Sequence, residues 1–331
     1  SGIILDVSRL NRILEVNREE RWARVQPGIV LAELNRQLAR DGLLFGPDPS
    51  SGDMCKLGGM LANNSSGPHT LRYGAVKDNV ISLRTCLVSG TWLDAQAYGL
   101  NDPALERLLT STPLVREILV LVQAHADLIR SKKPTVSKNS CGYNLFGLAD
   151  GLEKGRFDIP KLLVGSEGTL GVMSEATLKL VHKPKATLTA LIHFRHLQEV
   201  GEAVPRLLEL NPSDLEVMDA NTLNLIGRGK HGIPADAAAT LLIELDTHAP
   251  EIDLRERAET MTAICRPYKL AAELTLAFDA ERREQLWKAR KALYPTLYRF
   301  DPKKKPINFV DDVVVPAERI SELIRYLEEF F

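Results

Sequence analysis

LGGMLANNSSG, at residues 57–67, gathers glycine, asparagine and serine into a stretch that carries no charge. Glycines let a backbone approach a ligand closely and adopt positive φ angles. Asn63 and Asn64 tolerate left-handed conformations and offer side-chain amides. Ser65, Ser66 and free backbone N–H groups can form a nest that binds an anion such as a diphosphate. The stretch therefore predicts a phosphate-binding loop, with an ordinary tight loop as the alternative.

A second glycine-rich stretch, GSEGTLG at residues 165–171, lies between two predicted strands, Leu162–Val164 and Val172–Leu180. It lacks Gly-Lys-Ser/Thr and no helix is predicted after it, so the fingerprints of P-loop nucleotide-triphosphatases and Rossmann domains both fail. A strand–loop–strand arrangement fits backbone contact with the flat, polar part of a cofactor. A decorated hairpin explains the pattern equally well.

The elements around the two stretches change character near Pro184. Before it, short strands (Ile3–Leu5, Arg24–Gln26, Val80–Val88) mix with helices (Leu31–Arg40, and two within Pro103–Lys132 separated near Pro113). After it, strands are predicted at Leu188–Phe194, Leu215–Met218, Thr240–Leu245 and Glu273–Phe278, alternating with helices at Leu197–Leu210, Ile252–Cys265 and Ala280–Tyr294. This is an α+β layout with a helix-covered sheet, and a domain boundary is expected within His182–Lys185.

Composition excludes several classes of partner. The 331 residues carry 42 Lys and Arg against 43 Asp and Glu, a net charge of −1, so no basic excess exists to neutralise a nucleic acid. No apolar run approaches the ~20 residues of a transmembrane helix. Cys55, Cys86, Cys141 and Cys265 form no Cys-x-x-Cys, so the chain alone builds neither an iron–sulfur cluster nor a zinc ribbon. A reduced, cytoplasmic protein is predicted.

Together with Arg72-Tyr73-Gly74 and GPDPSS at residues 46–51, the two glycine stretches resemble the vanillyl-alcohol oxidase superfamily of flavoproteins. Within it, the chain is most similar to the FAD-linked D-lactate, glycolate and D-2-hydroxyglutarate dehydrogenases. The resemblance implies a PCMH-type FAD-binding domain over residues 1–183 and a ferredoxin-like cap or substrate domain over residues 184–331. It also implies that both domains are incomplete here, because the family's N-terminal pyrophosphate loop and C-terminal histidines are expected outside the chain.

The cofactor implied by the resemblance is FAD, held noncovalently between two α+β subdomains, with its isoalloxazine ring facing the ferredoxin-like cap domain. The residues implied to line it are Pro47, Asp48, Gly58, Gly59, Asn63, Asn64, Ser66, Gly67, Gly74, Glu167, Gly168, Leu170, Gly171 and Val172. His69 lies inside the first motif, where some relatives attach flavin covalently, but a surface or loop-capping role is favoured. Whether the chain alone retains FAD stays open.

Substrate-binding residues are marked less clearly. Lys138 and Asn139 resemble a family segment that faces the flavin or a carboxylate, with a capped helix start before Leu145 as an equal alternative. Arg290, in Trp287-Lys288-Ala289-Arg290, resembles the arginine that binds the carboxylate of a 2-hydroxy acid, a role that suits its two-pronged guanidinium. A solvated helix face is the alternative. Asn308–Pro316 resembles an acidic strand of the family, or equally a simple edge strand.

The implied reaction is oxidation of a 2-hydroxy acid by hydride transfer to flavin. The catalytic histidines are expected beyond the chain end, and the parent protein is expected to add a divalent metal and iron–sulfur clusters; no metal site is predicted within the chain. Electrons would pass to a quinone, a cytochrome or an iron–sulfur module. Alternatives are a sugar-lactone oxidase, a non-redox FAD synthase and an inactive folded fragment. A homodimer and peripheral association of the parent protein with the inner membrane also stay open.

Overall fold

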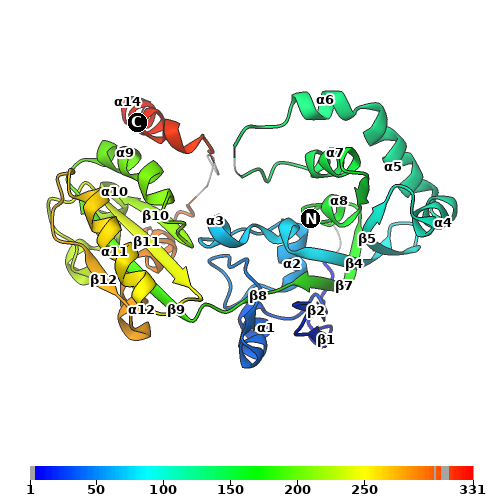
Figure 1. Ribbon diagram of the computed structural model, residues 1–331, viewed down its shortest axis with the longest axis horizontal. Helices are drawn as coiled ribbons and strands as arrows, with labels where there is room; N and C mark the ends of the chain where they lie inside the picture. The colour runs from blue at the N-terminus through cyan, green and yellow to red at the C-terminus, as the bar shows by residue number, and fades with distance from the viewer. Residues whose placement is uncertain (1–3, 137, 302, 307–312, 331) are drawn as a thin grey trace. The chain divides into compact units, whose positions relative to one another are not determined.

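The computed structural model describes residues 4–136, 138–301, 303–306 and 313–330. Contacts between residues divide the chain into two compact units, Ser1–Lys183 and Pro184–Phe331. Both units combine helices with antiparallel sheets, which confirms the predicted α+β class (Figure 1).

The first unit is built on a six-stranded antiparallel sheet. In spatial order its strands are β1 (Ile13–Asn17), β2 (Trp22–Val25), β7 (Gly171–Lys179), β4 (Val80–Leu87), β5 (Trp92–Gly99) and β6 (Arg156–Asp158). Strand β5 alternates buried residues such as Leu93 and Ala95 with exposed ones, so one face packs on the core and the other is solvated. Because β7 pairs with both β2 and β4, the second glycine stretch enters the middle of this sheet.

Eight α-helices belong to the described part of the first unit. They are α1 (Leu31–Leu38), α2 (Leu57–Ala62), α3 (Thr70–Tyr73), α4 (Pro103–Ser111), α5 (Pro113–Ala124), α6 (Ala126–Ser131), α7 (Leu145–Glu153) and α8 (Pro160–Leu163). Helices α4 to α7 gather beside β5 and β6 (Figure 1). A two-stranded sheet of β3 (Leu43–Leu44) and β8 (Val181–His182) completes the unit.

Some predictions for the first unit are confirmed and others are wrong. Helix α1 buries Leu31, Leu34 and Leu38, as predicted. The strand predicted at Leu162–Val164 is wrong, because Pro160 begins the short helix α8 there; proline suits a first helical position. The strand predicted at Ile3–Leu5 is also wrong for Ile4 and Leu5, which form no strand and are 90% and 58% exposed. Three helices, not two, occupy residues 103–131.

The second unit has the predicted ferredoxin-like topology. Its elements run β9 (Ala186–Phe194), α9 (Leu197–Leu208), β10 (Asp214–Asp219), β11 (Ala239–Thr247), α11 (Ile252–Cys265) and β12 (Thr275–Ala277). The sheet order is β10-β11-β9-β12, and every pairing is antiparallel. Helix α10 (Ala220–Ile226) is inserted after β10, and α12 (Ala280–Lys291), α13 (Leu293–Phe300) and α14 (Ile320–Phe330) follow. The strand predicted over Asn308–Pro316 falls largely outside the described residues, and residues 313–316 form no strand.

The two faces of this second sheet differ in polarity. Alternate residues of a strand point to opposite faces, and one face of β9 and β11 packs apolar side chains such as Ile192 and Ile243 against α9 and α11. The other face carries Thr189, His193 and Glu244, and it is partly covered by α10 and α12. A polar, largely buried face therefore lies under α12, the helix that contains Arg290.

His193 gives this polar face a pH-dependent stability. The imidazole is 3% exposed and its Nδ1 lies 2.9 Å from Thr240 Oγ1. Burial lowers the pKa of His193, so its contribution to stability is present above the unfolded pKa of about 6.5. That contribution is lost as pH falls through the folded value, at up to about 1.4 kcal/mol per pH unit.

We therefore expect the melting temperature of the wild type to fall more than that of His193→Asn between pH 7.5 and pH 5. Asparagine keeps a polar group near Thr240 and does not titrate. Differential scanning calorimetry across this range checks the result. Parallel melting curves for the two proteins would contradict it.

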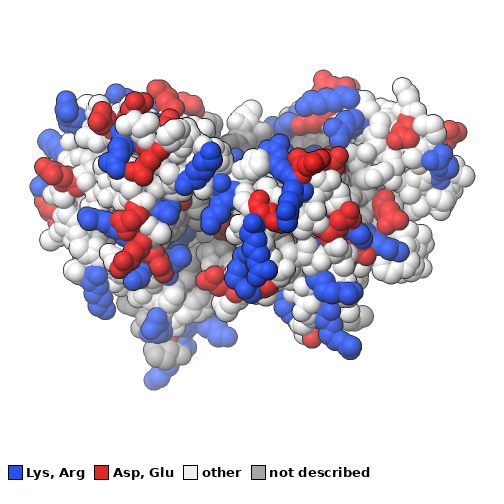
Figure 2. Space-filling view, turned by 60° about the horizontal axis from the view of Figure 1, so that its bottom comes forward, with Lys and Arg blue, Asp and Glu red and all other residues white. Residues whose placement is uncertain are grey.

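The surface is mixed in charge. Figure 2 shows acidic and basic side chains interspersed over the visible face, in keeping with the net charge of −1. Among the described helices, none combines the length and apolar character that crossing a membrane requires.

Candidate functional site

The first glycine stretch is a short helix followed by a tight cap, not the loop predicted from its composition. Leu57, Met60 and Leu61 are buried on one side of α2. After the helix, Asn64 takes the left-handed conformation with φ of 51°. Ser65 N donates to Met60 O (2.9 Å) and Asn64 N donates to Leu61 O (3.4 Å), which is the Schellman arrangement of a helix C-terminus.

This cap reduces the predicted anion-binding nest. The backbone N–H groups of Asn63, Asn64 and Ser65 all donate to carbonyls of α2, so they are not available to a diphosphate. The Ser66 N–H differs, since it donates to no acceptor within the described part of the chain. The anion-binding role predicted for the whole loop is therefore limited to Ser66 and the turn after it.

The second glycine stretch forms a tight turn that presents backbone donors. Glu167 and Gly168 have φ angles of 50° and 77°, and Thr169 N donates to Ser166 O at 3.0 Å. Positive φ at both central positions is the type I′ turn, which favours glycine. Within the described residues, the N–H groups of Gly168 and Leu170 have no acceptor, and Ser166 Oγ is buried without a hydrogen-bond partner.

The two stretches, about a hundred residues apart in sequence, are joined into one site. Gly165 N donates to Leu61 O and Glu167 N donates to Ala62 O, both at 2.8 Å. The acceptors are carbonyls in the last turn of α2, which have no partner inside the helix. The second stretch thus completes the end of the helix that the first stretch forms.

The joined stretches fit a large anionic cofactor. They offer unpartnered backbone donors at Ser66, Gly168 and Leu170 among the described residues. A Cβ added to Gly59 or Gly168 would meet no atom within 4 Å, so the backbone at both positions is open to close approach by a ligand. Open backbone and spare N–H donors are what binding of a diphosphate or a flavin ring edge requires.

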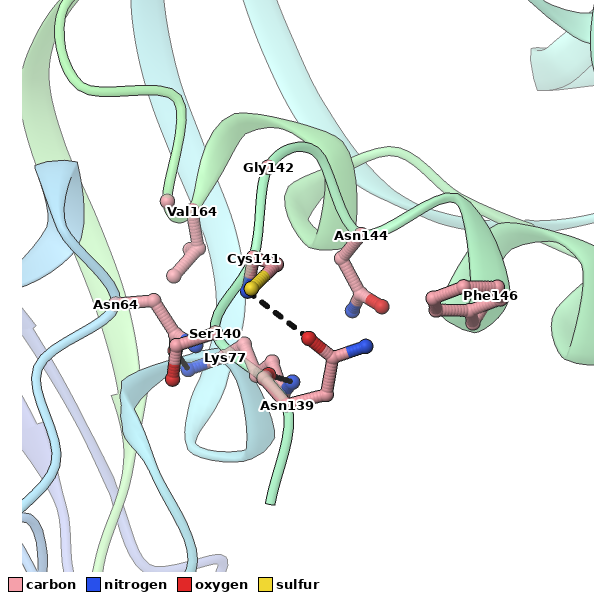
Figure 3. A pocket seen from close by; sticks show the side chains of 10 residues that line it. Asn64, Lys77, Asn139, Ser140, Cys141, Gly142, Asn144, Phe146 and Val164 are labelled. Atoms are coloured by element: carbon pink, nitrogen blue, oxygen red, sulfur yellow. Dashed lines mark hydrogen bonds between the residues drawn. The ribbon is translucent and has the colours of Figure 1, made fainter. Parts of the chain in front are cut away.

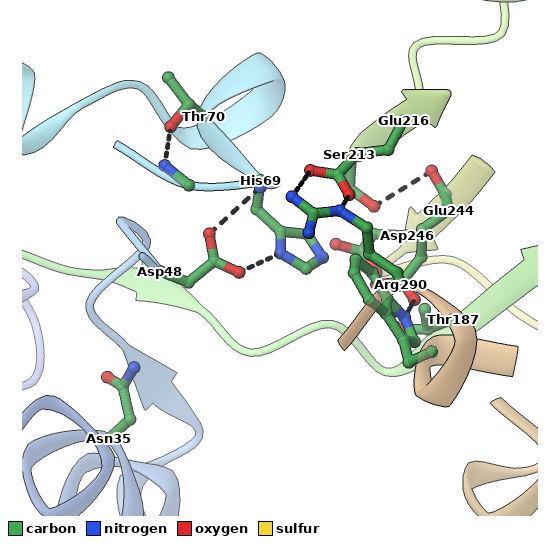
Figure 4. Close-up of polar contacts among 12 residues, drawn as sticks. Asn35, Asp48, His69, Thr70, Thr187, Ser213, Glu216, Glu244, Asp246 and Arg290 are labelled. Atoms are coloured by element: carbon green, nitrogen blue, oxygen red, sulfur yellow. Dashed lines mark hydrogen bonds and ion pairs between the residues drawn. The ribbon is translucent and has the colours of Figure 1, made fainter. Parts of the chain in front are cut away.

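Asp48 and His69 fasten the preceding segment to the first stretch. Asp48 Oδ1 accepts from His69 N at 3.1 Å, and Asp48 Oδ2 lies in hydrogen-bond contact with His69 Nδ1 (Figure 4). Gly67 packs directly on Asp48, because a Cβ added there would lie 2.1 Å from the Asp48 carbonyl oxygen. The loop-capping role favoured for His69 agrees with these contacts.

A third segment, residues 138–144, reaches the same place. Lys77 N donates to Asn64 Oδ1 (2.8 Å), and Lys77 Nζ donates to Asn139 O (2.6 Å). Tyr143 Oη lies 2.8 Å from Thr169 Oγ1 in the second stretch. A small pocket lies among these groups, with Cys141 and Asn64 on its wall (Figure 3). Burial lowers the pKa of the Lys77 amine.

The predicted cofactor residues play different structural parts. Gly58, Gly67 and Gly171 lie where a Cβ would meet neighbouring atoms at 3.0, 2.1 and 2.6 Å, so packing alone explains these glycines. Other members are accessible to a ligand. Gly59, Asn63, Glu167, Gly168 and Val172 are exposed, and Ser66, Gly74 and Leu170 are partly so. Pro47 is buried.

For the third segment, the sequence allowed either a ligand-binding role or a capped helix start before Leu145, and the structure bears on both. Asn144 caps α7, with its Oδ1 accepting from Gly147 N at 3.0 Å, so the predicted helix start is present. Asn139 turns its side chain to its own segment, where Oδ1 accepts from Cys141 N at 2.9 Å. Lys138 is half-buried. A binding role for Lys138 and Asn139 stays a prediction.

In the second unit, Arg290 is paired rather than solvated. Its Nε and Nη2 both donate to the carboxylate of Glu216, the latter at 3.1 Å (Figure 4). The side chains of Arg290 and Glu216 are only 22% and 19% exposed. Burial lowers the pKa of Arg290, but the hydrogen bond and charge of Glu216, together with the charges of Tyr294 and Asp214, raise it overall. The solvated helix face considered as an alternative is therefore wrong.

A second contact holds the same helix. Trp287 Nε1 donates to Glu244 Oε2 at 3.0 Å, and Thr189 Oγ1 donates to the same oxygen at 2.6 Å. Trp287 and Arg290 are three residues apart, so they share one face of α12. Among the described residues, no group of three or more His, Cys, Asp or Glu side chains is arranged to hold a metal ion.

Sequence reasoning missed Lys77, Tyr143 and Glu216. The partners of these residues are 26 to 74 positions away, and neither spacing nor composition indicates such pairs. The helix α2 did leave a signal, because Leu57, Met60 and Leu61 follow the i, i+3, i+4 pattern of an amphipathic helix.

Comparison with known families finds two matches. Residues 1–96 match the family described as FAD binding domain, and residues 183–331 match the C-terminal domain of FAD linked oxidases.

Curated relatives cover nearly the whole chain. A D-2-hydroxyglutarate dehydrogenase of Pantoea ananatis is 30% identical over 99% of this chain and 34% of its own length. The glycolate oxidase subunit GlcD of Bacillus subtilis is 29% identical over 99% of this chain and 58% of its own length. The chain thus spans between about a third and three fifths of these relatives.

A solved structure of alkyldihydroxyacetonephosphate synthase shares the fold. Its TM-score is 0.57 at 20% identity, covering 89% of this chain and 46% of the synthase.

Proposed function

We propose that this chain, which belongs to the FAD-linked oxidases, binds FAD noncovalently at the joined glycine stretches and contributes to oxidation of a 2-hydroxy acid. The observation that supports this most directly is the pair of hydrogen bonds from Gly165 and Glu167 to the end of α2. They make two separate motifs into one surface of open backbone. Exposed Asn63 and half-buried Ser66 border this surface, and we propose both as cofactor contacts.

The substrate class follows from the relatives and from Arg290. The relatives are named for D-2-hydroxyglutarate and glycolate, and a guanidinium on a helix is suited to the carboxylate that all 2-hydroxy acids share. FAD, when bound there, would supply the acceptor for the hydride at C2 of the hydroxy acid. The part of this chain is to bind and orient the acid through Arg290, with Lys138 and Asn139 as further candidates.

The electron acceptor is proposed to be a quinone, a cytochrome or an iron–sulfur module. We further propose that the protein acts in the cytoplasm or at the inner membrane face, where such acceptors are found. A dimer is compatible with the proposal but is not required by it.

The proposal is tested by reconstituting the purified chain with FAD and adding glycolate, D-lactate or D-2-hydroxyglutarate without oxygen. We expect a yellow protein whose flavin absorbance bleaches with at least one acid and recovers with an artificial acceptor. A colourless, well-folded protein would support the inactive fragment instead. A yellow protein that no 2-hydroxy acid bleaches would support a sugar-lactone oxidase or a non-redox synthase.

Replacing Arg290 tests the substrate assignment. Truncating one member of a buried charge pair costs about 2–5 kcal/mol of binding, so we expect Arg290→Met to raise KM about 100-fold. Arg282→Met is the matched control, since Arg282 is exposed on the same helix. Steady-state kinetics with the acid that bleaches the flavin measures both variants. Equal KM values for the two variants would remove Arg290 from the substrate site.

A further inference from the structure

We propose that Glu216 is a positioning residue, which holds the guanidinium of Arg290 by one edge so that its other edge binds the carboxylate of the 2-hydroxy acid. This inference rests on the proposed function of Arg290 and adds a residue to it.

Glu216 binds one edge of the Arg290 guanidinium and leaves the other edge without a hydrogen-bond partner among the described residues. A guanidinium offers five N–H donors in a rigid plane. Glu216 takes the side edge formed by Nε and Nη2. The Nη1 atom, at the end of the plane, donates to no group within the described residues. One carboxylate can therefore stay on the side edge while a second binds at the end, through Nη1 and the remaining N–H of Nη2.

Strands β10 and β11 hold α12 and so fix the orientation of the Arg290 guanidinium. Glu216 is on β10, and Asp214, two residues earlier, pairs in register with Glu244 of β11. Residues directly opposite in an antiparallel pair share a face, so Glu216 and Glu244 lie on the same face of the sheet. Glu244 holds Trp287 and Glu216 holds Arg290, so neighbouring strands fasten the same face of α12 at two points.

An electrostatic role and a positioning role of Glu216 predict opposite effects of its replacement on binding of the acid. The Glu216 carboxylate repels a second carboxylate, so on charge alone any neutral replacement should tighten binding of the acid. If Glu216 instead acts by position, the shape of the replacement decides the result. Glutamine keeps an oxygen that accepts from Arg290, whereas alanine lets the long side chain of arginine rotate freely. Glu216→Gln and Glu216→Ala remove the same charge and differ only in the retained contact.

The experiment measures binding and turnover in the FAD-loaded protein. Affinity for glycolate, D-lactate and D-2-hydroxyglutarate is measured by isothermal titration calorimetry, and KM and kcat by steady-state kinetics. We expect Glu216→Ala to weaken binding and raise KM at least tenfold, with kcat changed less than threefold. We expect Glu216→Gln to stay within threefold of the wild type. Glu251→Ala, which removes an exposed ion pair of the same unit, is the control for loss of a surface charge.

Two results in the Glu216 variants would overturn the inference, and Arg290→Met shows whether the substrate assignment fails with it. Affinity in Glu216→Ala equal to or tighter than in the wild type, with only the melting temperature lowered, would leave Glu216 a structural partner. Equal weakening in the Gln and Ala variants would show that the contact retained by glutamine does not matter, which the positioning role excludes. If Arg290→Met also leaves the affinity unchanged, the substrate assignment of Arg290 fails together with the inference. If only the Glu216 variants are without effect, the assignment of Arg290 stands and the inference alone fails.

Discussion

Replacing Gly67 by alanine is expected to destabilise the first unit by about 3 kcal/mol. The added Cβ would lie 2.1 Å from the carbonyl oxygen of Asp48 and 2.4 Å from its carbonyl carbon. These are backbone atoms, so no side-chain rotation relieves the overlap. Overpacking usually costs about 1–3 kcal/mol, and a backbone neighbour places this substitution at the upper end. For a unit of this size the melting temperature should fall by roughly 6–12 °C.

Gly59→Ala is the matched control for this substitution. It lies in the same stretch, but its Cβ would meet nothing within 4 Å, and alanine stabilises a helix by up to about 1 kcal/mol relative to glycine. We expect Gly59→Ala to be as stable as the wild type or more so. If FAD approaches the backbone of α2, the same variant should also lose flavin, measured as the absorbance ratio of flavin to protein. An unchanged melting temperature in Gly67→Ala would contradict the packing of Gly67 on Asp48.

The second unit shows how much of the fold the sequence predicts. Its strands and helices alternate with clear periodicity, and the predicted Ile252–Cys265 is identical in extent to α11. The ferredoxin-like order then follows from the resemblance and is confirmed in the sheet. Hydrophobic periodicity reports which face of an element is buried, and here α9 and α11 each bury one face against the apolar side of the sheet.

The first unit shows where this reasoning stops. The composition of residues 57–67 predicts a loop, whereas the structure has the helix α2 there, with Leu57, Met60 and Leu61 buried. The contact between Gly165 and Leu61 depends on β7 entering between β2 and β4. Strand order of this kind is decided by the packing of the whole sheet. Local patterns therefore identify the two glycine stretches but do not predict that they are hydrogen-bonded to each other.

Asn64 is the residue at which the three segments of the candidate site meet, and its replacement by alanine is expected to cost about 2–4 kcal/mol. Two effects combine. Alanine tolerates the φ of 51° less well than asparagine, at a cost of about 1 kcal/mol. The Lys77 N–H also loses its acceptor, Asn64 Oδ1 at 2.8 Å, and an unsatisfied buried donor costs about 1–3 kcal/mol.

Two further variants separate these effects. Asn64→Gly accepts the left-handed conformation but still lacks the oxygen, so its loss should be smaller than that of alanine by about 1 kcal/mol. Asn64→Asp keeps both the oxygen and the tolerance for positive φ, so its stability should lie near that of the wild type. Chemical denaturation should therefore rank the proteins as wild type and Asp, then Gly, then Ala. A glycine variant as unstable as alanine would show that the backbone conformation contributes nothing.

Flavin content should separate the variants by the Asn64 oxygen, for a reason that stability alone does not supply. Lys77 holds Asn139 through its Nζ and Asn64 through its N–H, so loss of the Asn64 oxygen frees Lys77 and loosens residues 138–144 beside the second stretch. Measured well below the melting temperature, where every variant is folded, flavin retention that is lower in Gly and Ala than in the wild type and Asp would place the cofactor at this junction. Flavin retention that is equal in all four proteins would place it elsewhere, even if the order of stability holds.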